Sequence, residues 1–362
     1  MRRRRHAQAI GFALLCAGLA ACSSPSPPVP STTDSATAAA AGSRDVSFVV
    51  DGTTAYGTLD VPAHHEGQHL AAAVLLAGSG GTDRDGNQPG LTPNTLKQIA
   101  EALDRMGIIS VRFDKYFAGR TGAGTYASDP AAIDLNAFIR QAGGAYKLLY
   151  NLPETDRQRM LVIGHSEGGL YAMLLAEAAA PRPAGLALVE PLDERSLDLL
   201  AVQINEGLEV QVNNGTITAD TARRNAQGVR SAIAAFRAGQ PVDLRNLLPT
   251  VVTALKPFLL TPANAKFERT EDAIDPATFA ARLPAGLRVL MTDGTADRNV
   301  PPQTIQRLAV GLARAGTTGP GLQRLDNLDH YLHPAGTPEN GAQLDPAFLH
   351  ALSAWAQPFA SG

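Results

Sequence analysis

A serine between glycines is the strongest candidate for chemistry in this sequence. A G-x-S-x-G motif occupies residues 164–168, with Ser166 at its centre, after the apolar run 160–163 and before a helix-forming stretch. A strand that turns tightly into a helix at such a motif exposes the serine hydroxyl, and glycines permit the close backbone approach. The helix N-terminus behind the serine favours developing negative charge. The motif therefore predicts that Ser166 is a nucleophile.

Such a serine needs a histidine to take its proton and a carboxylate to orient that histidine. Asp293 and Asp297 both follow the apolar run 287–291. Asp293 lies nearer to the end of that run, although its Asp-Gly pair also suits a simple turn. His330 stands in an Asp-His-Tyr segment after the last strand-like run, whereas His333 and His350 are expected to be surface or helix residues. His330 is the candidate base, and both aspartates are candidate acids.

A tetrahedral intermediate of acyl transfer also needs backbone N–H donors. The N–H of Glu167, directly after the candidate nucleophile, is one candidate. A glycine-rich loop at 77–81, which includes Ser79, follows the apolar run 71–76 and offers the other. The loop lacks the Lys-Ser/Thr of a P-loop, so the sequence does not favour phosphate binding there.

Alternating strands and helices must position these residues. Short apolar runs rich in β-branched residues alternate with longer amphipathic stretches, which predicts an α/β fold with a mostly parallel central sheet flanked by helices. Asp51-Gly52 between two such runs predicts a hairpin. Strands are expected at 46–50, 55–61, 71–76, 108–113, 160–163, 186–189, 287–291 and 322–325, and helices around 92–106, 131–150, 168–180, 302–314 and 346–357.

The alternation breaks between residues 191 and 284, where apolar residues recur at helical spacing and no convincing strand appears. This segment is too long for an ordinary connection. It predicts a helical cap inserted into a core formed by 45–190 and 285–362. The charged residues Asp83, Arg84, Asp85 and Lys115 are expected to form a network that shapes the glycine-rich loop.

Several of these segments together carry a family resemblance. Residues 78–87, GSGGTDRDGN, and the segment Arg112-Phe113-Asp114-Lys115 resemble elements of secreted bacterial α/β-hydrolases in the serine-aminopeptidase and dienelactone-hydrolase-like branches. The resemblance covers most of residues 45–360 outside the cap. It implies the α/β-hydrolase fold, and catalytic residues in the chain order serine, acid, histidine, but it gives nothing in the cap.

The same resemblance assigns particular residues. The loop Gly-Thr-Ala-Asp-Arg-Asn-Val-Pro resembles the one that carries the acid in many α/β-hydrolases, which points to Asp297, while some families place the acid where Glu190 stands. It also points to His330 as the base and to the Ser79 N–H as an oxyanion donor. Ala77 stands where many relatives carry histidine, so the support of that loop is expected to differ. No metal or organic cofactor is implied.

The N-terminus is expected to be a targeting segment rather than part of the folded domain. An arginine-rich start and a short apolar stretch, residues 1–21, are typical of a signal peptide. Leu-Ala-Ala-Cys at 19–22 resembles the lipobox of bacterial lipoproteins, which implies cleavage, lipidation of Cys22 and attachment to a membrane. The Ser-, Pro- and Ala-rich segment that continues to residue 44 predicts a flexible tether. The expected location is the extracytoplasmic cell envelope.

Bulk composition limits the function classes. The 362 residues include 44% hydrophobic and 18% charged residues, which is typical of a globular protein. A formal net charge of −3 gives no basic surface for nucleic acid. The favoured activity is hydrolysis of carboxylic esters of a small-molecule or lipid-like acyl substrate. Peptidase, thioesterase and acyltransferase activities use the same residues, and a catalytically silent envelope binding protein is the alternative outside catalysis.

Overall fold

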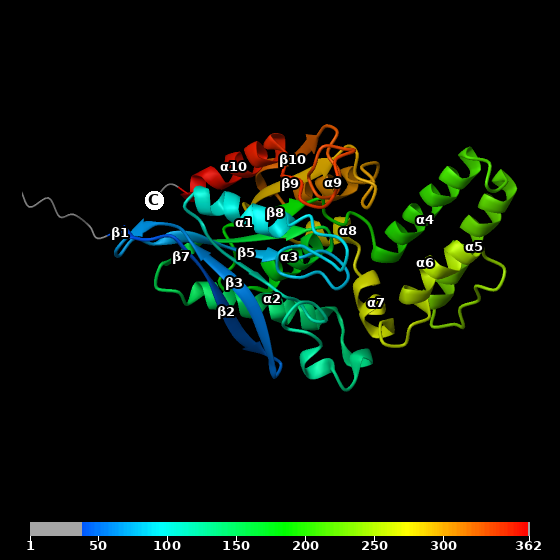
Figure 1. Ribbon diagram of the computed structural model, residues 1–362, viewed down its shortest axis with the longest axis horizontal. Helices are drawn as coiled ribbons and strands as arrows, with labels where there is room; N and C mark the ends of the chain where they lie inside the picture. Colours follow the sequence, from blue (N-terminus) through cyan, green and yellow to red (C-terminus); the bar gives the residue numbers. More distant parts are fainter. Residues whose placement is uncertain (1–37, 361–362) are drawn as a thin grey trace, which may run out of the picture. The chain divides into compact units, whose positions relative to one another are not determined.

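The computed structural model describes residues 38–360, in which eight strands form one mixed sheet (Figure 1). The strands lie in the order β10-β9-β8-β7-β5-β6-β3-β2. The six strands from β10 to β6 run parallel, and β3 and β2 are antiparallel to their neighbours. Their bounds are β2 Gly42–Val50, β3 Thr53–Val61, β5 Leu70–Leu76, β6 Ile109–Phe113, β7 Thr155–His165, β8 Gly185–Val189, β9 Arg288–Gly294 and β10 Thr318–Leu325.

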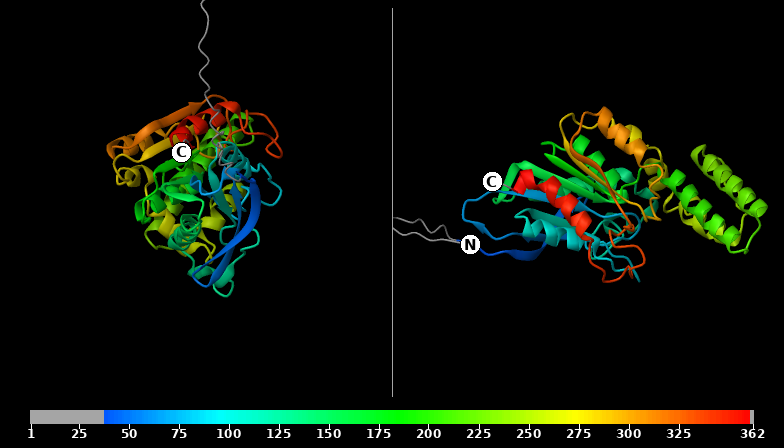
Figure 2. Two further views of the ribbon diagram at one scale, coloured as in Figure 1. Left: turned by 90° about the vertical axis from the view of Figure 1, so that its left-hand side faces the viewer. Right: turned by 90° about the horizontal axis from the view of Figure 1, so that it is seen from above.

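Helices cover both faces of this sheet (Figure 2). On one face α1 (Thr95–Arg105) and α10 (Pro346–Ala360) pack against the strands. On the other face lie α2 (Leu135–Tyr150), α3 (Glu167–Ala178), α8 (Pro276–Ala280) and α9 (Gln306–Arg314). Alternate residues of β5 enter the two cores, and all seven residues of this strand are buried. Burial on both faces explains why the central strands are continuous apolar runs.

The antiparallel edge of the sheet begins earlier than the sequence indicates. The tether was expected to reach residue 44, but β2 already begins at Gly42, and Ala38–Ala39 (β1) pairs with His64–His65 (β4). The hairpin at Asp51-Gly52 sets the register Val50↔Thr53, which continues back to Gly42↔Val61. Ladder hydrogen bonds need no apolar side chain, so this end of β2 carries no hydrophobic signal. Cys22 and the leader at 1–21 lie outside the described residues.

The segment between β8 and β9 is helical. It contains α4 (Ser196–Asn213), α5 (Ala219–Arg237), α6 (Pro249–Leu259) and α7 (Ala265–Asp272), followed by α8. Apolar residues between Leu197 and Leu259 form a cluster of their own, and α4, α5 and α6 lie together beside the sheet (Figures 1 and 2). In contrast, Phe279 and Ala280 of α8 belong to the core cluster of the sheet. The inserted apolar unit therefore ends before α8, rather than at residue 284.

The helix α7 ties this inserted unit to the rest of the chain. Asp272, at the end of α7, is 2% exposed and forms ion pairs with Arg195 and Arg237. Phe267 packs against the core cluster of the sheet.

Among the residues that the structure describes, no helix has the length and apolar character needed to cross a bilayer.

Candidate active site

Ser166 occupies a strained turn between the central strand β7 and the helix α3. Its backbone has φ 57° and ψ −127°, a conformation that few residues other than glycine adopt. Its N–H donates to the Val189 carbonyl at 2.9 Å, which fixes the turn against β8. A Cβ at Gly164 would collide with the backbone of Gly168, so the turn requires its glycines. The Ser166 side chain thus lies at the carboxyl edge of the sheet, at the N-terminus of α3.

His330 and Asp297 come together at the same edge of the sheet. His330 Nδ1 lies 2.7 Å from Asp297 Oδ2, and the two residues are 6% and 4% exposed. The other oxygen of Asp297 accepts the N–H groups of Asn299 at 2.7 Å and Val300 at 2.9 Å. These donors fix the carboxylate, which in turn fixes the ring. Such a pair leaves Nε2 of the histidine available for a proton.

The other candidate acids are engaged elsewhere. Asp293 lies within β9 and forms an ion pair with Arg324 of β10 at 3.2 Å. Burial raises the pKa of Asp293 to about 6. The Glu190 carboxylate accepts from the Thr292 hydroxyl at 2.9 Å and from the Gly294 N–H at 2.6 Å. Of the three acids, Asp297 is the one that contacts His330.

His165 contacts the candidate base through the backbone carbonyl of His330. Its Nε2 lies 2.8 Å from the carbonyl oxygen of His330, and the two rings have centroids 4.8 Å apart. Burial, together with the neighbouring His330, lowers the pKa of His165 to about 3, so its ring is neutral at physiological pH. A neutral ring donates from Nε2 to this carbonyl. The contact joins the segment before Ser166 to the segment that carries His330.

The described chain contains no hydrogen bond between the Ser166 hydroxyl and His330. The segment that carries Ser166 nevertheless lies beside His330, because His165, next to Ser166 in the chain, contacts His330 directly. Hydrogen bonds of this kind are often long in ligand-free enzymes and tighten when substrate binds.

Two backbone N–H groups near Ser166 have no acceptor. Within residues 38–360, neither the Ser79 N–H nor the Glu167 N–H donates a hydrogen bond to the chain. The loop that carries Ser79 lies against the turn, since a Cβ at Gly78 would lie 3.0 Å from the Ser166 Cβ. The Ser79 carbonyl accepts from Thr82 at 2.7 Å and Gln88 at 2.9 Å, which holds the loop from its other side.

Lys115 joins the two segments that carry these N–H groups. Its ammonium group donates to the Gly78 carbonyl and forms an ion pair with Glu167 Oε2 at 3.0 Å. The lysine and glutamate are 5% and 4% exposed. Buried ion pairs hold geometry best when every proton has an acceptor. Lys115 is therefore a positioning residue for the spacing between the loop and the turn.

We expect Lys115→Met to lower kcat by about 10- to 100-fold with a smaller change in KM, because misplaced N–H donors stabilise the oxyanion less well. Steady-state hydrolysis of p-nitrophenyl acetate measures both constants. Lys97→Met, at an exposed position of α1, is the matched control. Equal kcat values for Lys115→Met and Lys97→Met, in variants that melt as the parent does, would contradict this role.

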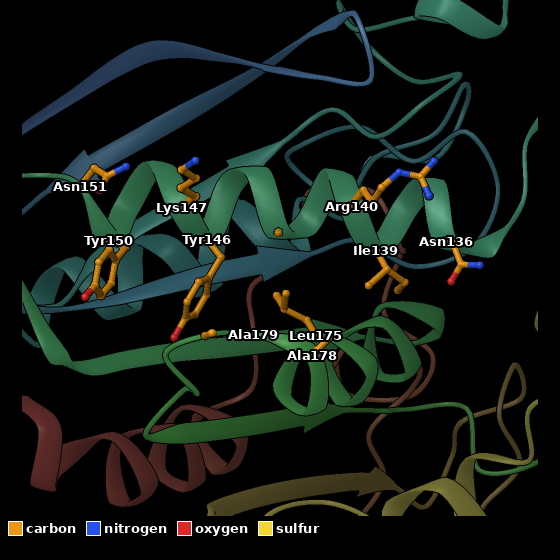
Figure 3. Close-up of a pocket in the computed structure, with 12 residues that line it drawn as sticks. Asn136, Ile139, Arg140, Tyr146, Lys147, Tyr150, Asn151, Leu175, Ala178 and Ala179 are labelled. Carbon is orange, nitrogen blue, oxygen red and sulfur yellow. The ribbon is translucent and has the colours of Figure 1, made fainter.

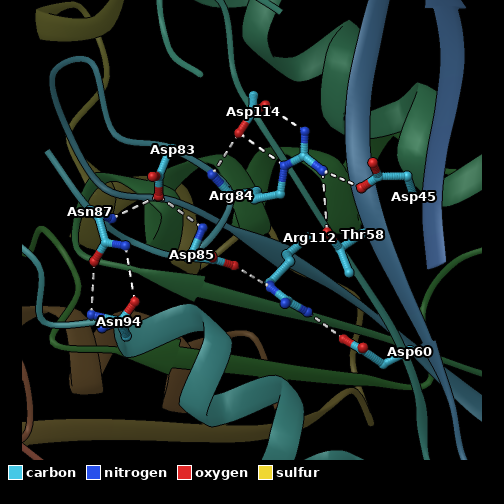
Figure 4. A network of polar contacts seen from close by, with 10 residues as sticks. All are labelled: Asp45, Thr58, Asp60, Asp83, Arg84, Asp85, Asn87, Asn94, Arg112 and Asp114. Atoms are coloured by element: carbon cyan, nitrogen blue, oxygen red, sulfur yellow. Dashed lines mark hydrogen bonds and ion pairs between the residues drawn. The ribbon is translucent and has the colours of Figure 1, made fainter. Parts of the chain in front are cut away.

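A charged network holds the rest of the loop after β5 (Figure 4). Arg84 pairs with Asp114 at 2.7 Å, and Arg112 pairs with Asp85 at 2.7 Å. Asp83 accepts the N–H groups of Asp85 and Asn87 at 2.9 Å each. Asp83, Arg84 and Asp85 therefore lie in the network expected from the sequence. Lys115, which was expected to join them, contacts the loop at a separate point.

Two cavities lie at opposite ends of α3. One, of about 750 Å³, lies between α2 and the far end of α3 and is lined by residues such as Tyr146, Tyr150 and Leu175 (Figure 3). It is at the opposite end of α3 from Ser166. The other, of about 680 Å³, is lined by Ser79 and Glu167 together with residues of α6 and α7. The second cavity therefore adjoins the candidate oxyanion donors.

Sequence reasoning missed some residues around the site. His333 was expected to be a surface or helix residue but is fully buried, with both ring nitrogens unpartnered. Burial lowers the pKa of His333. Glu268 and Glu271 of α7 line the cavity beside Ser79, more than a hundred residues along the chain from Glu167. No local pattern marks these two glutamates. Among the described residues, no cluster of histidine, cysteine and carboxylate side chains is arranged to hold a metal ion.

No protein-family model matches this sequence, and no curated protein matches it. Solved structures do match. Est1E from Butyrivibrio proteoclasticus, with ferulic acid bound, has a TM-score of 0.54 at 14% identity over 88% of this chain and 100% of its own. The Pyrococcus furiosus esterase Pf2001 gives 0.53 at 14% identity, covering 89% of this chain and 92% of its own. DcsB, in complex with its substrate analogue, gives 0.53 at 14% identity over 89% and 100%.

At 14% identity, the similarity to these solved structures shows the fold alone. The sheet order, the helices on both faces and the position of the serine turn agree with it. The chain has the α/β-hydrolase fold, with a helical insertion between β8 and β9.

Proposed function

We propose that this protein is a serine hydrolase that cleaves carboxylic esters through Ser166, His330 and Asp297. The observation that carries the proposal is the 2.7 Å contact between His330 and Asp297 beside the strained turn of Ser166. The two unpaired N–H groups of Ser79 and Glu167 add the donors that acyl transfer needs. Pf2001, whose fold this chain shares, is an esterase, which agrees with this reaction.

In the first half of the reaction, His330 Nε2 takes the proton of the Ser166 hydroxyl as the oxygen attacks the ester carbonyl carbon. The carbonyl oxygen gains negative charge, and the N–H groups of Ser79 and Glu167 stabilise it by donating hydrogen bonds to it. Asp297 stabilises the imidazolium that forms. The carbon–oxygen bond to the leaving alcohol then breaks, and the proton of His330 passes to that alcohol. Ser166 is left as an acyl ester.

Water completes the cycle in the second half. His330 takes a proton from water, whose oxygen attacks the acyl carbon, and the same N–H groups hold the second oxyanion. Collapse of this intermediate breaks the bond to Ser166, and the proton returns to the serine oxygen. The products are a carboxylic acid, an alcohol and the starting enzyme.

A series of p-nitrophenyl esters from acetate to palmitate tests this reaction directly. We expect release of p-nitrophenol well above the buffer rate for the short esters. The chain length with the highest kcat/KM reports the space available to the acyl group. Failure of folded protein to hydrolyse any ester in the series would overturn the proposal.

We further propose that the protein works at a membrane surface, attached through lipidated Cys22 after removal of residues 1–21. The support is the Leu-Ala-Ala-Cys segment and the polar segment that follows it. Mass spectrometry of the protein made in a bacterial host would show a diacylglyceryl group on Cys22. A Cys22→Ala variant found in the membrane fraction as abundantly as the parent would contradict this attachment.

A further inference from the structure

The cavity beside Ser79 holds more buried acids than cations. Glu167 of α3 lines it, together with Glu268 and Glu271 of α7. The three glutamates are 4%, 5% and 3% exposed. Lys115 is the cation in the cavity lining, and its ammonium group lies 3.0 Å from Glu167. Lys115 therefore balances the negative charge of Glu167, and the two acids of α7 are left without an ion-pair partner in the described chain.

One carboxylate oxygen of each of these two acids lacks a hydrogen-bond partner. Glu268 Oε2 and Glu271 Oε1 are buried and make no hydrogen bond, and the same is true of the Tyr171 hydroxyl in the same cavity. A buried polar group without a partner destabilises the fold, and a charged one does so more strongly. Three such atoms, on residues that line one cavity, leave unused hydrogen-bonding capacity beside it.

The walls of the cavity suit an organic cation. Phe138 and Phe267 meet edge to face with ring centroids 5.2 Å apart, and both line the cavity. Aromatic faces attract cations and also pack against the apolar body that carries the charge. The ammonium group of Lys115 itself lies 5.8 Å from the centre of the Phe138 ring.

Burial determines how the two acids titrate when the cavity is empty. It raises the pKa of Glu268 to about 8, and the neighbouring Glu167 and Asp272 add to this effect. Burial, with Glu167 and Glu268 nearby, also raises the pKa of Glu271 well above its usual range, which Lys115 opposes. Glu268 is therefore largely protonated at neutral pH, and burial favours the protonated form of Glu271 as well. A cation favours the ionised carboxylate, so its binding lowers both pKa values and releases protons.

We propose that this cavity is a subsite for a primary ammonium group of the substrate, bound by Glu268 and Glu271. This rests on the proposed function and names its substrate class: an ester in which the acid or the alcohol carries an amine on an aromatic or aliphatic body. Ser79 and Glu167 both line the cavity, so a bound amine would lie beside the proposed oxyanion donors. A primary ammonium group has three protons, which can satisfy the unpartnered oxygens of both glutamates and Tyr171.

Calorimetric titration of the Ser166→Ala protein with benzylammonium tests the subsite without any turnover. We expect benzylammonium to bind and benzyl alcohol, a neutral ligand of similar size, to bind at least about tenfold more weakly. Titration in two buffers of different ionisation enthalpy should show proton release. The affinity should rise from pH 6 to pH 8, because fewer protons have to leave the carboxyls at the higher pH.

Glutamine replacements identify the groups responsible. Glu268→Gln/Glu271→Gln, in the Ser166→Ala background, should lower the benzylammonium affinity at least about tenfold. The exposed pair Glu66→Gln/Glu101→Gln is the matched control and should bind as the parent does. If the double variant does not fold, each single variant is titrated instead, after a melting curve has shown that it is folded.

Equal binding of benzylammonium and benzyl alcohol would overturn the subsite, as would unchanged affinity in the folded Glu268→Gln/Glu271→Gln protein. These results are separate from catalysis. Ammonium binding without ester hydrolysis would support the subsite and contradict the proposed function. Ester hydrolysis without ammonium binding would do the reverse.

Discussion

Replacing Ser166 with alanine is expected to lower kcat for p-nitrophenyl acetate by at least about 10⁴-fold. The variant keeps the cavity and the backbone N–H groups but has no oxygen to attack the ester. Alanine also fits the turn no worse than serine, since both side chains have a Cβ at φ 57°. The loss should therefore appear in turnover and not in folding.

Ser353→Ala, at an exposed position of α10, is the matched control and should keep the parental rate. Initial rates at several substrate concentrations, with circular dichroism of each variant, measure both effects. Turnover by folded Ser166→Ala within tenfold of the parent would assign the nucleophile elsewhere.

Asp297→Asn is expected to lower kcat by about 10³- to 10⁴-fold with little change in KM. The amide keeps the size of the carboxylate, and its oxygen can still accept the N–H groups of Asn299 and Val300. It carries no charge to stabilise the imidazolium, however, and its NH₂ group favours the wrong tautomer of His330. The loss should fall on the chemical step.

The variant Asp293→Asn separates the two aspartates that sequence spacing left open. Asp293 pairs with Arg324 and does not contact His330. Its replacement should change kcat less than about threefold, because it touches neither the base nor the oxyanion donors. A larger loss of kcat in Asp293→Asn than in Asp297→Asn would reverse the assignment of the acid.

The fold was predictable where local signals are strong. Burial on both faces makes β5 and the core of β7 continuous apolar runs, and such runs are readable in the sequence. The strand–turn–helix context of Ser166 follows from the same pattern. Helical spacing in the inserted segment predicted α4, α5 and α6, because each buries one apolar face in a shared cluster.

The start of β2 and the end of the inserted unit were not predictable in this way. Residues 42–45 of β2 are exposed, and only backbone hydrogen bonds hold them to β3. The helix α8 has five residues, too few to show helical periodicity, yet it packs in the core of the sheet. In both places tertiary contacts decide a boundary that side-chain pattern does not mark.

Within the site, the pairing of His330 with Asp297 depended on the resemblance of their loops, since spacing alone also allowed Asp293. The contact of His165 with His330 spans 165 positions. The contribution of Glu268 and Glu271 to the cavity depends on how α7 lies over the oxyanion loop. Such juxtapositions arise from the tertiary fold, so residue type and local spacing carry no sign of them.

Covalent labelling by a fluorophosphonate tests the central claim most directly, since it reports an activated serine whatever the natural substrate is. The protein is incubated with the probe and digested, and mass spectrometry locates the adduct. We expect one adduct, on Ser166, and much slower labelling in His330→Gln and in heat-denatured protein. Absence of an adduct on Ser166 in folded protein, or equally fast labelling after denaturation, would contradict a serine hydrolase mechanism.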